Sequence, residues 1–483
     1  MTCVETLVTV VTDQMLVADL TGPDDLRFDL LTSEDGSADH RLKVVTRKPM
    51  SLTRIMPHLA ALGVEVIDER QSELDLAGDR ILIYNLGFRE AEGVDFGPQD
   101  INRFADALRA SYFGQAEAGR MARLVMTAKL SWQQVAVLRA MSRYLQQAGT
   151  PFSQTYIGNA LVAYPKIANA LVDAFEIKFD PTRKYADIDA RRAAFEKAAG
   201  KIEKSLDDVA SLDHDRIIRM MLALLRAIVR TNAYADDRPA LAFKLLPREL
   251  DLLPEPRPRF EIYVYSPEVH GVHLRFGSVA RGGLRWSDRA EDFRTETLGL
   301  AKAQMVKNTV IVPVGAKGGF VPQQLPDPSV DRAGWQAGGV AAYKTFISSL
   351  LSVTDNIVKG EVVPPVDVIR YDGDDPYLVV AADKGTASFS DYANGISIER
   401  GFWLGDAFAS GGSVGYDHKG MGITARGAWE SVKRHFFEMG RDDQTDDFTC
   451  VGIGDMAGDV FGNGMLLSEH TKLVAAFNHM HVF

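Results

Sequence analysis

The chain has 483 residues, of which 46% are hydrophobic and 25% charged, a composition typical of a soluble globular protein with about three domains. Its net charge of −11, from 65 acidic residues against 54 lysines and arginines, argues against binding to nucleic acid or to an anionic membrane. Cys3 and Cys450 are the two cysteines. With no recognisable signal peptide, they predict a cytoplasmic protein without disulfides.

The first part of the chain, residues 1–98, predicts a small α+β module. Its hydrophobic period changes from 2 to 3.6 and back, which indicates strands around one amphipathic helix. The predicted strands are 40–48, 64–74 and 79–88, and the predicted helix is 51–63. Gly63 is expected to end that helix.

The next part, residues 99–250, predicts a helical region. Apolar residues recur at three- and four-residue spacing over 101–114, 131–149 and 214–230. Ser131 is expected to cap the second of these helices. The proline-rich segment 251–260 predicts a linker or a domain boundary.

Residues 259–445 predict an α/β domain with a parallel or mixed sheet, because strand and helix patterns alternate there. The predicted strands are 260–267, 271–280, 309–314 and 377–383, and the predicted helices are 291–308, 334–358 and 423–440.

Cations gather beside glycine-rich turns between Ala280 and Phe320. They are Arg281, Arg285, Lys307 and Lys317. In a chain that is acidic overall, this cluster favours a small anionic substrate, and the glycines allow the backbone to approach a ligand closely.

Two lysines of this cluster have specific chemical roles open to them. Lys307 lies three residues after Gln304, so both side chains share one face of the predicted helix and can bind one ligand group; an ordinary polar helix face is the alternative. Lys317 stands between glycines after a predicted strand, where it can enter a cleft and transfer protons. A solvated lysine in a flexible turn is its alternative.

A carboxylate is expected at the end of the predicted strand 377–383. Asp383 would face the crevice at the carboxyl edge of the sheet, although a helix N-cap is an equal alternative. Asp374 and Asp375 are rival carboxylates that have the features of turn residues. The ten histidines suggest no metal site, since no set of Cys or carboxylate ligands accompanies them.

A dinucleotide-binding motif is predicted near the C-terminus. Gly452, Gly454 and Ala457 form G-x-G-x-x-A between a predicted strand, 448–455, and a predicted helix, 456–468. The glycines permit a tight turn, and the helix N-terminus can bind a pyrophosphate. The acidic residue that would bind the ribose is expected about 20 residues later, at or beyond the last residue, so the motif alone leaves NAD and NADP both open.

The chain stops within the predicted second strand of this unit. A folded dinucleotide domain needs several more strands. We therefore expect residues 446–483 to be the first part of a truncated Rossmann domain, and we expect these 483 residues alone to be inactive.

Six motifs point to one family. They are ARGGLRWSD, KAQMVKN, VGAKGGF, VVAADKGTASFSD, HKGMGITARGAWESVKRHF and VGIGDMAGDVFGNGML. Together they closely resemble the very large NAD-dependent glutamate dehydrogenases of bacteria, over essentially everything from Phe260 onward. The earlier parts resemble the ACT-like and helical regions of that family. The resemblance implies a multidomain α/β chain with a substrate domain of the amino-acid dehydrogenase type.

The resemblance also implies a reaction and a set of partners. The reaction is oxidative deamination of L-glutamate to 2-oxoglutarate and ammonia with hydride transfer to NAD, in a homo-oligomer. Arg281 matches the position that binds the distal carboxylate, and Gln304 and Lys307 match the pair that binds the α-carboxylate. Lys317 matches the catalytic lysine and Asp383 the proton-shuttling aspartate.

Thr424 matches the threonine at the nicotinamide end of the cofactor. The chain departs from smaller family members because Arg281 replaces their lysine and because the segment between Lys307 and Lys317 is shorter.

Two other functions stay open. One is an ACT-like amino-acid-sensing module without catalysis, and the other is a dehydrogenase for branched or aromatic amino acids.

Overall fold

The computed structural model describes residues 20, 22, 26–32, 38–76, 79–90, 94, 96–97, 99–236, 238–307, 314–383, 385–386, 388–415, 418–456, 458–478 and 480–483. They form two compact units. The first extends to Val379 and includes Asp383–Gly385, and the second comprises Val380–Ala382 and Thr386–Phe483.

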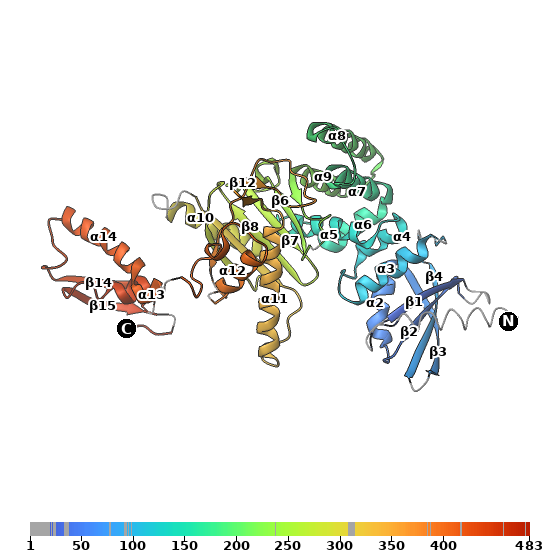
Figure 1. Ribbon diagram of the computed structural model, residues 1–483, viewed down its shortest axis with the longest axis horizontal. Helices are drawn as coiled ribbons and strands as arrows, with labels where there is room; N and C mark the ends of the chain where they lie inside the picture. The colour runs from blue at the N-terminus through green and yellow to red at the C-terminus, as the bar shows by residue number, and fades with distance from the viewer. Residues whose placement is uncertain are drawn as a thin grey trace. The chain divides into compact units, whose positions relative to one another are not determined.

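The first unit begins with a four-stranded antiparallel sheet and one helix (Figure 1). Its elements are β1 (Leu26–Thr32), β2 (His40–Thr46), α2 (Leu52–Leu62), β3 (Val64–Leu76) and β4 (Asp79–Glu90), in the sheet order β1-β2-β4-β3. Ile55, Leu59 and Leu62 form the buried face of α2. Gly63 ends the helix with a φ of 90°, a conformation that glycine adopts without a Cβ clash. The predicted strands and helix are confirmed, and β1 is an additional strand.

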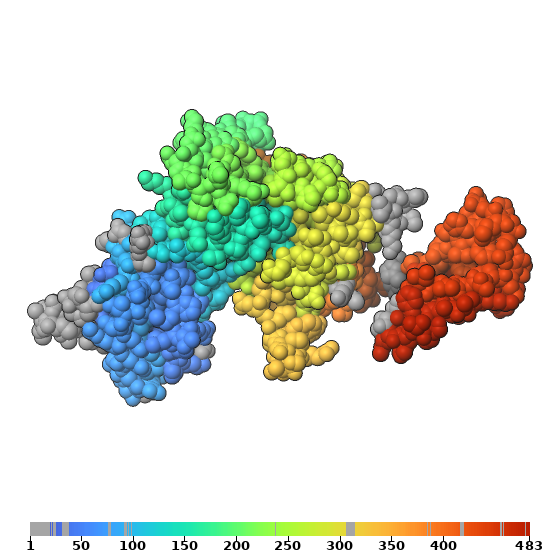
Figure 2. All heavy atoms as spheres, turned by 180° about the vertical axis from the view of Figure 1, so that it is seen from behind, coloured from blue at the N-terminus to red at the C-terminus, as the bar shows by residue number. Residues whose placement is uncertain are grey.

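Helices follow, as the hydrophobic spacing predicts. They are α3 (Asp100–Tyr112), α4 (Leu124–Thr127), α5 (Trp132–Gln147), α6 (Gln154–Ala163), α7 (Pro165–Phe179), α8 (Ile188–Ser205) and α9 (Leu212–Ala227). Ser131 caps α5 in a reciprocal arrangement with Gln134, so that two otherwise unpaired N–H groups are satisfied. One continuous core cluster connects the α+β module, these helices and the sheet that follows, and the segments lie against one another in Figure 2.

The second sheet contains a run of six strands of the first unit, in the order β9-β10-β8-β7-β6-β5. They are β5 (Ile228–Thr231), β6 (Leu241–Leu245), β7 (Phe260–Tyr265), β8 (Val269–Arg275), β9 (Gly282–Trp286) and β10 (Ala316–Pro322). β9 and β10 are parallel and the other pairs are antiparallel. The predicted mixed sheet is therefore confirmed.

Helices cover both faces of this sheet. Side chains alternate between the faces along each strand. On one face Tyr263 packs against Tyr144 of α5, and Glu261 pairs with Arg294 of α10 (Phe293–Lys307). On the other, Phe320 packs against Phe346 of α11 (Arg332–Leu351). We call these the α10 face and the α11 face. A hairpin of β11 (Asn356–Val358) and β12 (Glu361–Val363) follows α11.

The structure corrects several local predictions. The helical region expected over 99–250 ends in β5 and β6, two strands of the sheet. The proline-rich segment 251–260 connects β6 to its antiparallel neighbour β7, so it is a connection within one sheet and not a domain boundary. The strand predicted over 309–314 lies outside the described residues except for Val314.

The second unit contains β13 (Val380–Ala382), α12 (Ser390–Glu399), α13 (His418–Met421), α14 (Ile423–Glu438), β14 (Phe448–Asp455) and β15 (Thr471–Phe477). β14 and β15 are parallel. Between them, the predicted helix 456–468 is reduced to a short π-helical turn, Asp459–Asn463. No helix in the described ranges is both long enough and apolar enough to cross a membrane.

Candidate active site

Lys317 lies inside a strand and not in the flexible turn that was the alternative interpretation. It is the second residue of β10, opposite Leu274 of β8, and the next residue, Gly318, pairs with Leu284 of β9. The neighbouring glycines are needed for packing. A Cβ at Gly318 would lie 2.4 Å from Leu284, and one at Gly319 would lie 2.6 Å from the hydroxyl of Thr297 in α10. The side chain of Lys317 therefore projects from a paired strand on the α10 face.

Asp383 is the partner of Lys317. The lysine Nζ donates a hydrogen bond to Oδ2 of Asp383 at 2.7 Å, and Arg285 of β9 donates from Nη2 to Oδ1 at 3.2 Å. The side chains of Lys317 and Arg285 are 20% exposed and that of Asp383 is 14% exposed. This group, which we call the Asp383 cluster, can therefore be reached from solvent.

Glu296 of α10 completes the cluster. It accepts hydrogen bonds from Arg285 Nη1 at 2.9 Å and from the hydroxyl of Ser287 at 2.6 Å. Burial acts to lower the pKa of Arg285, but the bonds to Glu296 and Asp383 outweigh it and raise that pKa above its ordinary value. Arg285 therefore stays charged and holds one oxygen of Asp383. The sequence analysis places Arg285 among the clustered cations, but it does not identify Glu296. An acidic residue in the first turn of a helix is common, so the position of Glu296 in α10 does not by itself indicate a functional residue.

Gln304 connects α10 to the loop that carries Arg281. Its Nε2 donates to the carbonyl oxygen of Arg281 at 2.9 Å, and its Oε1 is buried without a hydrogen-bond partner. A Cβ at Gly282 would lie 1.5 Å from the carbonyl oxygen of Ala316. The glycine after Arg281 therefore lets this loop lie directly against β10, beside Lys317.

Arg281 and Lys307 differ in what the structure says of them. The side chain of Arg281 is exposed and forms no hydrogen bond or ion pair with any residue that the structure describes. Lys307 is the last residue of α10, but its side chain lies outside the described part of the chain. Arg281, Arg285, Gln304, Lys317 and Asp383 all belong to the first unit.

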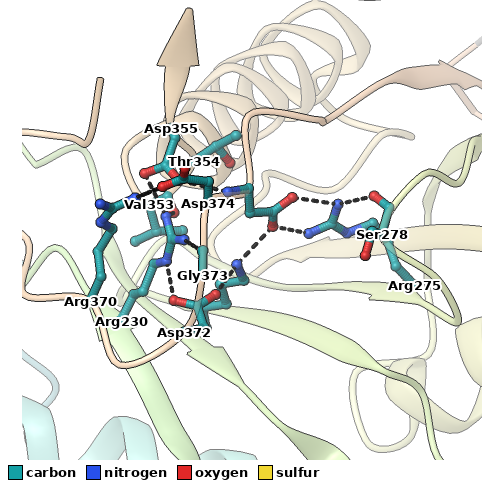
Figure 3. Close-up of polar contacts among 12 residues, drawn as sticks. Arg230, Arg275, Ser278, Val353, Thr354, Asp355, Arg370, Asp372, Gly373 and Asp374 are labelled. Atoms are coloured by element: carbon teal, nitrogen blue, oxygen red, sulfur yellow. Dashed lines mark hydrogen bonds and ion pairs between the residues drawn. The ribbon is translucent and has the colours of Figure 1, made fainter. Parts of the chain in front are cut away.

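The rival carboxylates have other partners on the α11 face (Figure 3). Asp375 accepts from Arg275 and from Lys244, the latter at 2.7 Å. Asp374 accepts from Arg370 at 2.8 Å. Burial acts to raise the pKa of Asp375, but the two cations outweigh it and lower that pKa to about 2. Asp375 is therefore ionised at neutral pH and belongs to a buried network.

That network includes three cations from the sheet and three carboxylates from the segment after α11. The cations are Arg230, Lys244 and Arg275, and the carboxylates are Asp355, Asp372 and Asp375. We call these six residues the buried network. Its side chains are between 0% and 8% exposed.

Arg275 links the buried network to the backbone around the candidate site. It donates from Nη1 to the carbonyl oxygens of Ser278 at 3.0 Å and Tyr377 at 2.7 Å. Ser278 lies three residues before Arg281, and Tyr377 lies six residues before Asp383. One buried guanidinium therefore fixes both chain segments that lead into the Asp383 cluster.

His270 and His273 lie within β8, on either side of Gly271. Burial lowers the pKa of His270 to about 4 and that of His273 to about 3, so both are neutral. Gly271 is required because a Cβ there would lie 2.5 Å from the ring of Phe346. No cluster of three or more potential metal ligands occurs among the described residues.

The second unit contains the glycine motif. Gly454 in β14 has a φ of 147°, and a Cβ there would lie 2.3 Å from the ring of Phe461. Gly452 is buried, and a Cβ there would lie 3.1 Å from the sulfur of Met456. Both glycines lie within β14, where their missing Cβ atoms let the strand pack closely against Met456 and Phe461 in the turn that follows, before the parallel strand β15. Ala457 lies outside the described residues.

Thr424 lies in the first turn of α14, close to this turn. Its backbone N–H donates to Oδ2 of Asp459 at 3.1 Å, and the residue is exposed. Asp459 is the first residue of the π-helical turn that follows the glycines. Thr424 is therefore connected to the glycine turn within the second unit.

Comparisons with known proteins identify the chain by three matching family models. Residues 25–101 match the ACT3 domain of glutamate dehydrogenase, and residues 116–181 match its helical motif 3. Residues 201–483 match the catalytic domain of bacterial NAD-glutamate dehydrogenase. Because this last match covers more than half of the chain, the chain belongs to the bacterial NAD-glutamate dehydrogenase family, and the resemblance predicted from its motifs is confirmed.

Individual relatives agree with this assignment. An NAD-specific glutamate dehydrogenase of Mycobacterium tuberculosis is 54% identical over 90% of this chain and 28% of its own length. One from Pseudomonas aeruginosa is 54% identical over 90% of this chain and 27% of its own length. The chain thus spans little more than a quarter of these relatives. Among solved structures, a hetero-hexameric glutamate dehydrogenase from Thermus thermophilus with leucine bound is 18% identical over 46% of this chain and 47% of that chain, at a TM-score of 0.29. That similarity is too low to support an argument.

Proposed function

We propose that the complete protein carrying this chain oxidatively deaminates L-glutamate to 2-oxoglutarate and ammonia, with NAD as the hydride acceptor. The observation that carries the proposal is the hydrogen bond of 2.7 Å between Lys317 and Asp383 in a chain of this family. A lysine paired with an aspartate, beside further cations and open to solvent, suits a reaction that moves protons on an anionic substrate.

Binding of a dicarboxylate is assigned to three side chains. Arg281, which is exposed and unpaired within the described residues, would bind the distal carboxylate through its two-pronged guanidinium. Gln304 uses one amide N–H on the carbonyl of Arg281, which leaves the second for the α-carboxylate. Lys307, three residues later on the same helix, would supply the balancing charge. Holding both ends of glutamate orients its α-carbon for reaction.

Proton movements are assigned to the Asp383 cluster. The bound NAD would accept the hydride from the α-carbon. Lys317 would then orient water for attack on the resulting imine carbon and stabilise the oxygen that develops negative charge. Asp383 would take the proton from that water and return it to the departing nitrogen. Arg285 and Glu296 would keep the carboxylate in position.

The cofactor is assigned to the second unit. Gly452, Gly454, Ala457 and Thr424 would bind NAD, the glycines by bringing the backbone close to the pyrophosphate. We propose an ACT-like module over 1–98, a helical region from 99 that ends before β5, and a substrate domain that begins with β5 and extends to 445. We propose that residues 446–483 are the first part of this Rossmann domain. We place the protein in the cytoplasm as a homo-oligomer.

The test is an NAD-linked assay of the complete protein with L-glutamate and with L-leucine. The unsubstituted protein should reduce NAD with glutamate and not with leucine. Arg281→Leu should lose at least about 100-fold in kcat/KM for glutamate, since a carboxylate loses a charged partner, and should gain little on leucine. Unchanged glutamate kinetics in Arg281→Leu would contradict the assignment of this residue, and an unsubstituted protein that does not oxidise glutamate would contradict the function.

A further inference from the structure

A polar cavity lies among the helices of the first unit. Its volume is about 180 Å³, and its lining residues belong to the segment after α3, to α5 and to α6. The polar lining residues include Glu117, Arg120, Arg139, Arg143, Gln154 and Thr155. We call it the arginine cavity.

The arginine cavity has an excess of positive charge. Among its described lining residues, Glu117 is the one acid against the three arginines. Arg143 donates to Glu117 Oε2 at 2.6 Å, and Nη1 of Arg139 lies 3.8 Å from the same oxygen. Burial acts to raise the pKa of Glu117, but Arg143 and Arg139 outweigh it and lower that pKa, so the acid is fully ionised. Three guanidiniums and one carboxylate leave two positive charges uncompensated.

Several donors of the arginine cavity remain available. Nε of Arg143 is buried without a hydrogen-bond partner, which is costly unless a ligand or water satisfies it. Arg139 is only 6% exposed, so its charge is largely removed from bulk water. Gln154 and Thr155 are the first two residues of α6, where backbone N–H groups have no acceptor within the helix.

We propose that the arginine cavity binds a small oxyanion with two negative charges, either a phosphate group or a dicarboxylate. Such a ligand matches the uncompensated charge, and planar guanidiniums donate pairs of hydrogen bonds to oxyanions of both kinds. The volume of about 180 Å³ is far more than one water molecule needs and leaves room for a ligand of this size. The site is separate in its residues from the Asp383 cluster.

Glu117 connects the arginine cavity to the sheet. Its Oε1 accepts a hydrogen bond from the hydroxyl of Tyr265 in β7 at 2.9 Å and lies 3.9 Å from Nε2 of His270 in β8. A bound oxyanion competes with Glu117 for Arg143 and Arg139. Occupancy therefore changes the charge that Tyr265 and His270 experience. His270 lies in β8, which pairs with β10, the strand of Lys317.

The test is isothermal titration of the 483-residue chain with inorganic phosphate and, separately, with succinate, at constant ionic strength against chloride. We expect saturable binding of at least one of them. Arg143→Gln should weaken it at least about tenfold, the effect of losing about one charged hydrogen bond, and Arg120→Gln, at an exposed position, should weaken it with little risk to folding. Glu117→Gln should tighten binding, because the competing carboxylate is removed.

The matched control is Arg183→Gln. This arginine bonds to Asp173 and Glu176 in the same helical region and does not line the arginine cavity, so its loss should leave the affinity unchanged. Binding of phosphate alone would identify a phosphate site and binding of succinate alone a dicarboxylate site. No saturable binding of either, or equal affinity in Arg120→Gln, Arg143→Gln and the unsubstituted chain, would overturn the proposal. The readout is binding without turnover, so it does not depend on the catalytic function.

Discussion

The two faces of one sheet contain the same kinds of charged residue in opposite circumstances. On the α11 face, the side chains of the buried network are at most 8% exposed and pair with one another. On the α10 face, the side chains of Lys317, Arg285, Asp383 and Glu296 are 14–20% exposed. Gln304 there has an unsatisfied oxygen and Arg281 has no partner within the described residues.

This contrast separates charges that hold the fold from charges that can bind a substrate. A closed, buried ion network leaves no group free for a ligand, and removal of one member leaves another charge unpaired in the interior. A partly exposed cluster adds less stability because water screens it, but it can exchange its partners for those of a ligand. We therefore expect substitutions in the buried network to act on stability, and substitutions in the Asp383 cluster to act on turnover.

The largest expected effect on turnover follows from Lys317→Met in the complete protein. The loss of the group that orients water should lower kcat at least about 1,000-fold, as for the loss of a principal catalytic group. The free energy of unfolding, measured with urea, should change by about 1 kcal/mol or less. A fall in kcat below tenfold would show that Lys317 has no catalytic part.

The largest expected effect on stability follows from Arg275→Met. Asp375 would keep its charge with one cation fewer, and the carbonyls of Ser278 and Tyr377 would lose their donor, so unfolding should become easier by about 3–5 kcal/mol. The segments before Arg281 and Asp383 should also shift, which would lower kcat.

Arg191→Met is the matched control for Arg275→Met. Arg191 is 6% exposed and donates to the carbonyls of Ile177 and Asp180 in the helical region. The Arg191→Met variant should therefore be less stable, but its kcat should equal that of the unsubstituted protein. Equal losses of kcat in both variants, measured well below their unfolding temperatures, would contradict the proposal that Arg275 positions the segments before Arg281 and Asp383.

A pH effect follows from Asp375. Its pKa is about 2 in the folded chain, below the ordinary 3.8, so its contribution to stability is present above about pH 4 and is lost as the pH falls towards 2. The loss should amount to roughly 2 kcal/mol. Asp375→Asn should be less stable at neutral pH and should lack this part of the acid dependence. An unchanged slope between pH 4 and pH 2 would contradict the ion pairing.

The smallest expected effect follows from Glu296→Gln. Arg285 would keep Asp383 but lose its second anchor, so kcat should fall about tenfold, the effect of one charged hydrogen bond on an adjacent group. Glu291→Gln provides a control, since Glu291 is exposed, lies two residues before the start of α10 and does not contact Arg285. A larger fall for Glu291→Gln than for Glu296→Gln would contradict the anchoring role.

Local patterns predicted the elements that depend on local order. The period of the side chains was enough for three of the four strands of the α+β module, for α5 with its cap at Ser131 and for α14. Lys317 shows where such reasoning fails. Glycines disfavour strands locally, but the segment pairs with β8 and β9 on both sides, and pairing between distant strands is not visible in a short window.

The candidate site was predictable in its residue types and not in its contacts. Arg281, Gln304, Lys317 and Asp383 stand in motifs that could be recognised. The anchors behind them could not, because Glu296 and Arg275 have ordinary neighbours in sequence. Glu296 anchors Arg285, whose partner Asp383 lies 98 residues further along the chain. Arg275 holds Tyr377, which lies 102 residues away, so only the folded sheet reveals these connections.

The most direct test of the account is a double-mutant cycle of Lys317→Met and Asp383→Asn in the complete protein, with kcat/KM for glutamate and urea unfolding measured on all four proteins. We predict that the double variant is hardly slower than either single variant, a strong coupling in turnover, while the coupling in unfolding stays below about 1 kcal/mol. Additive losses in kcat/KM, or a coupling seen only in unfolding, would show that this pair supports the fold and not the reaction.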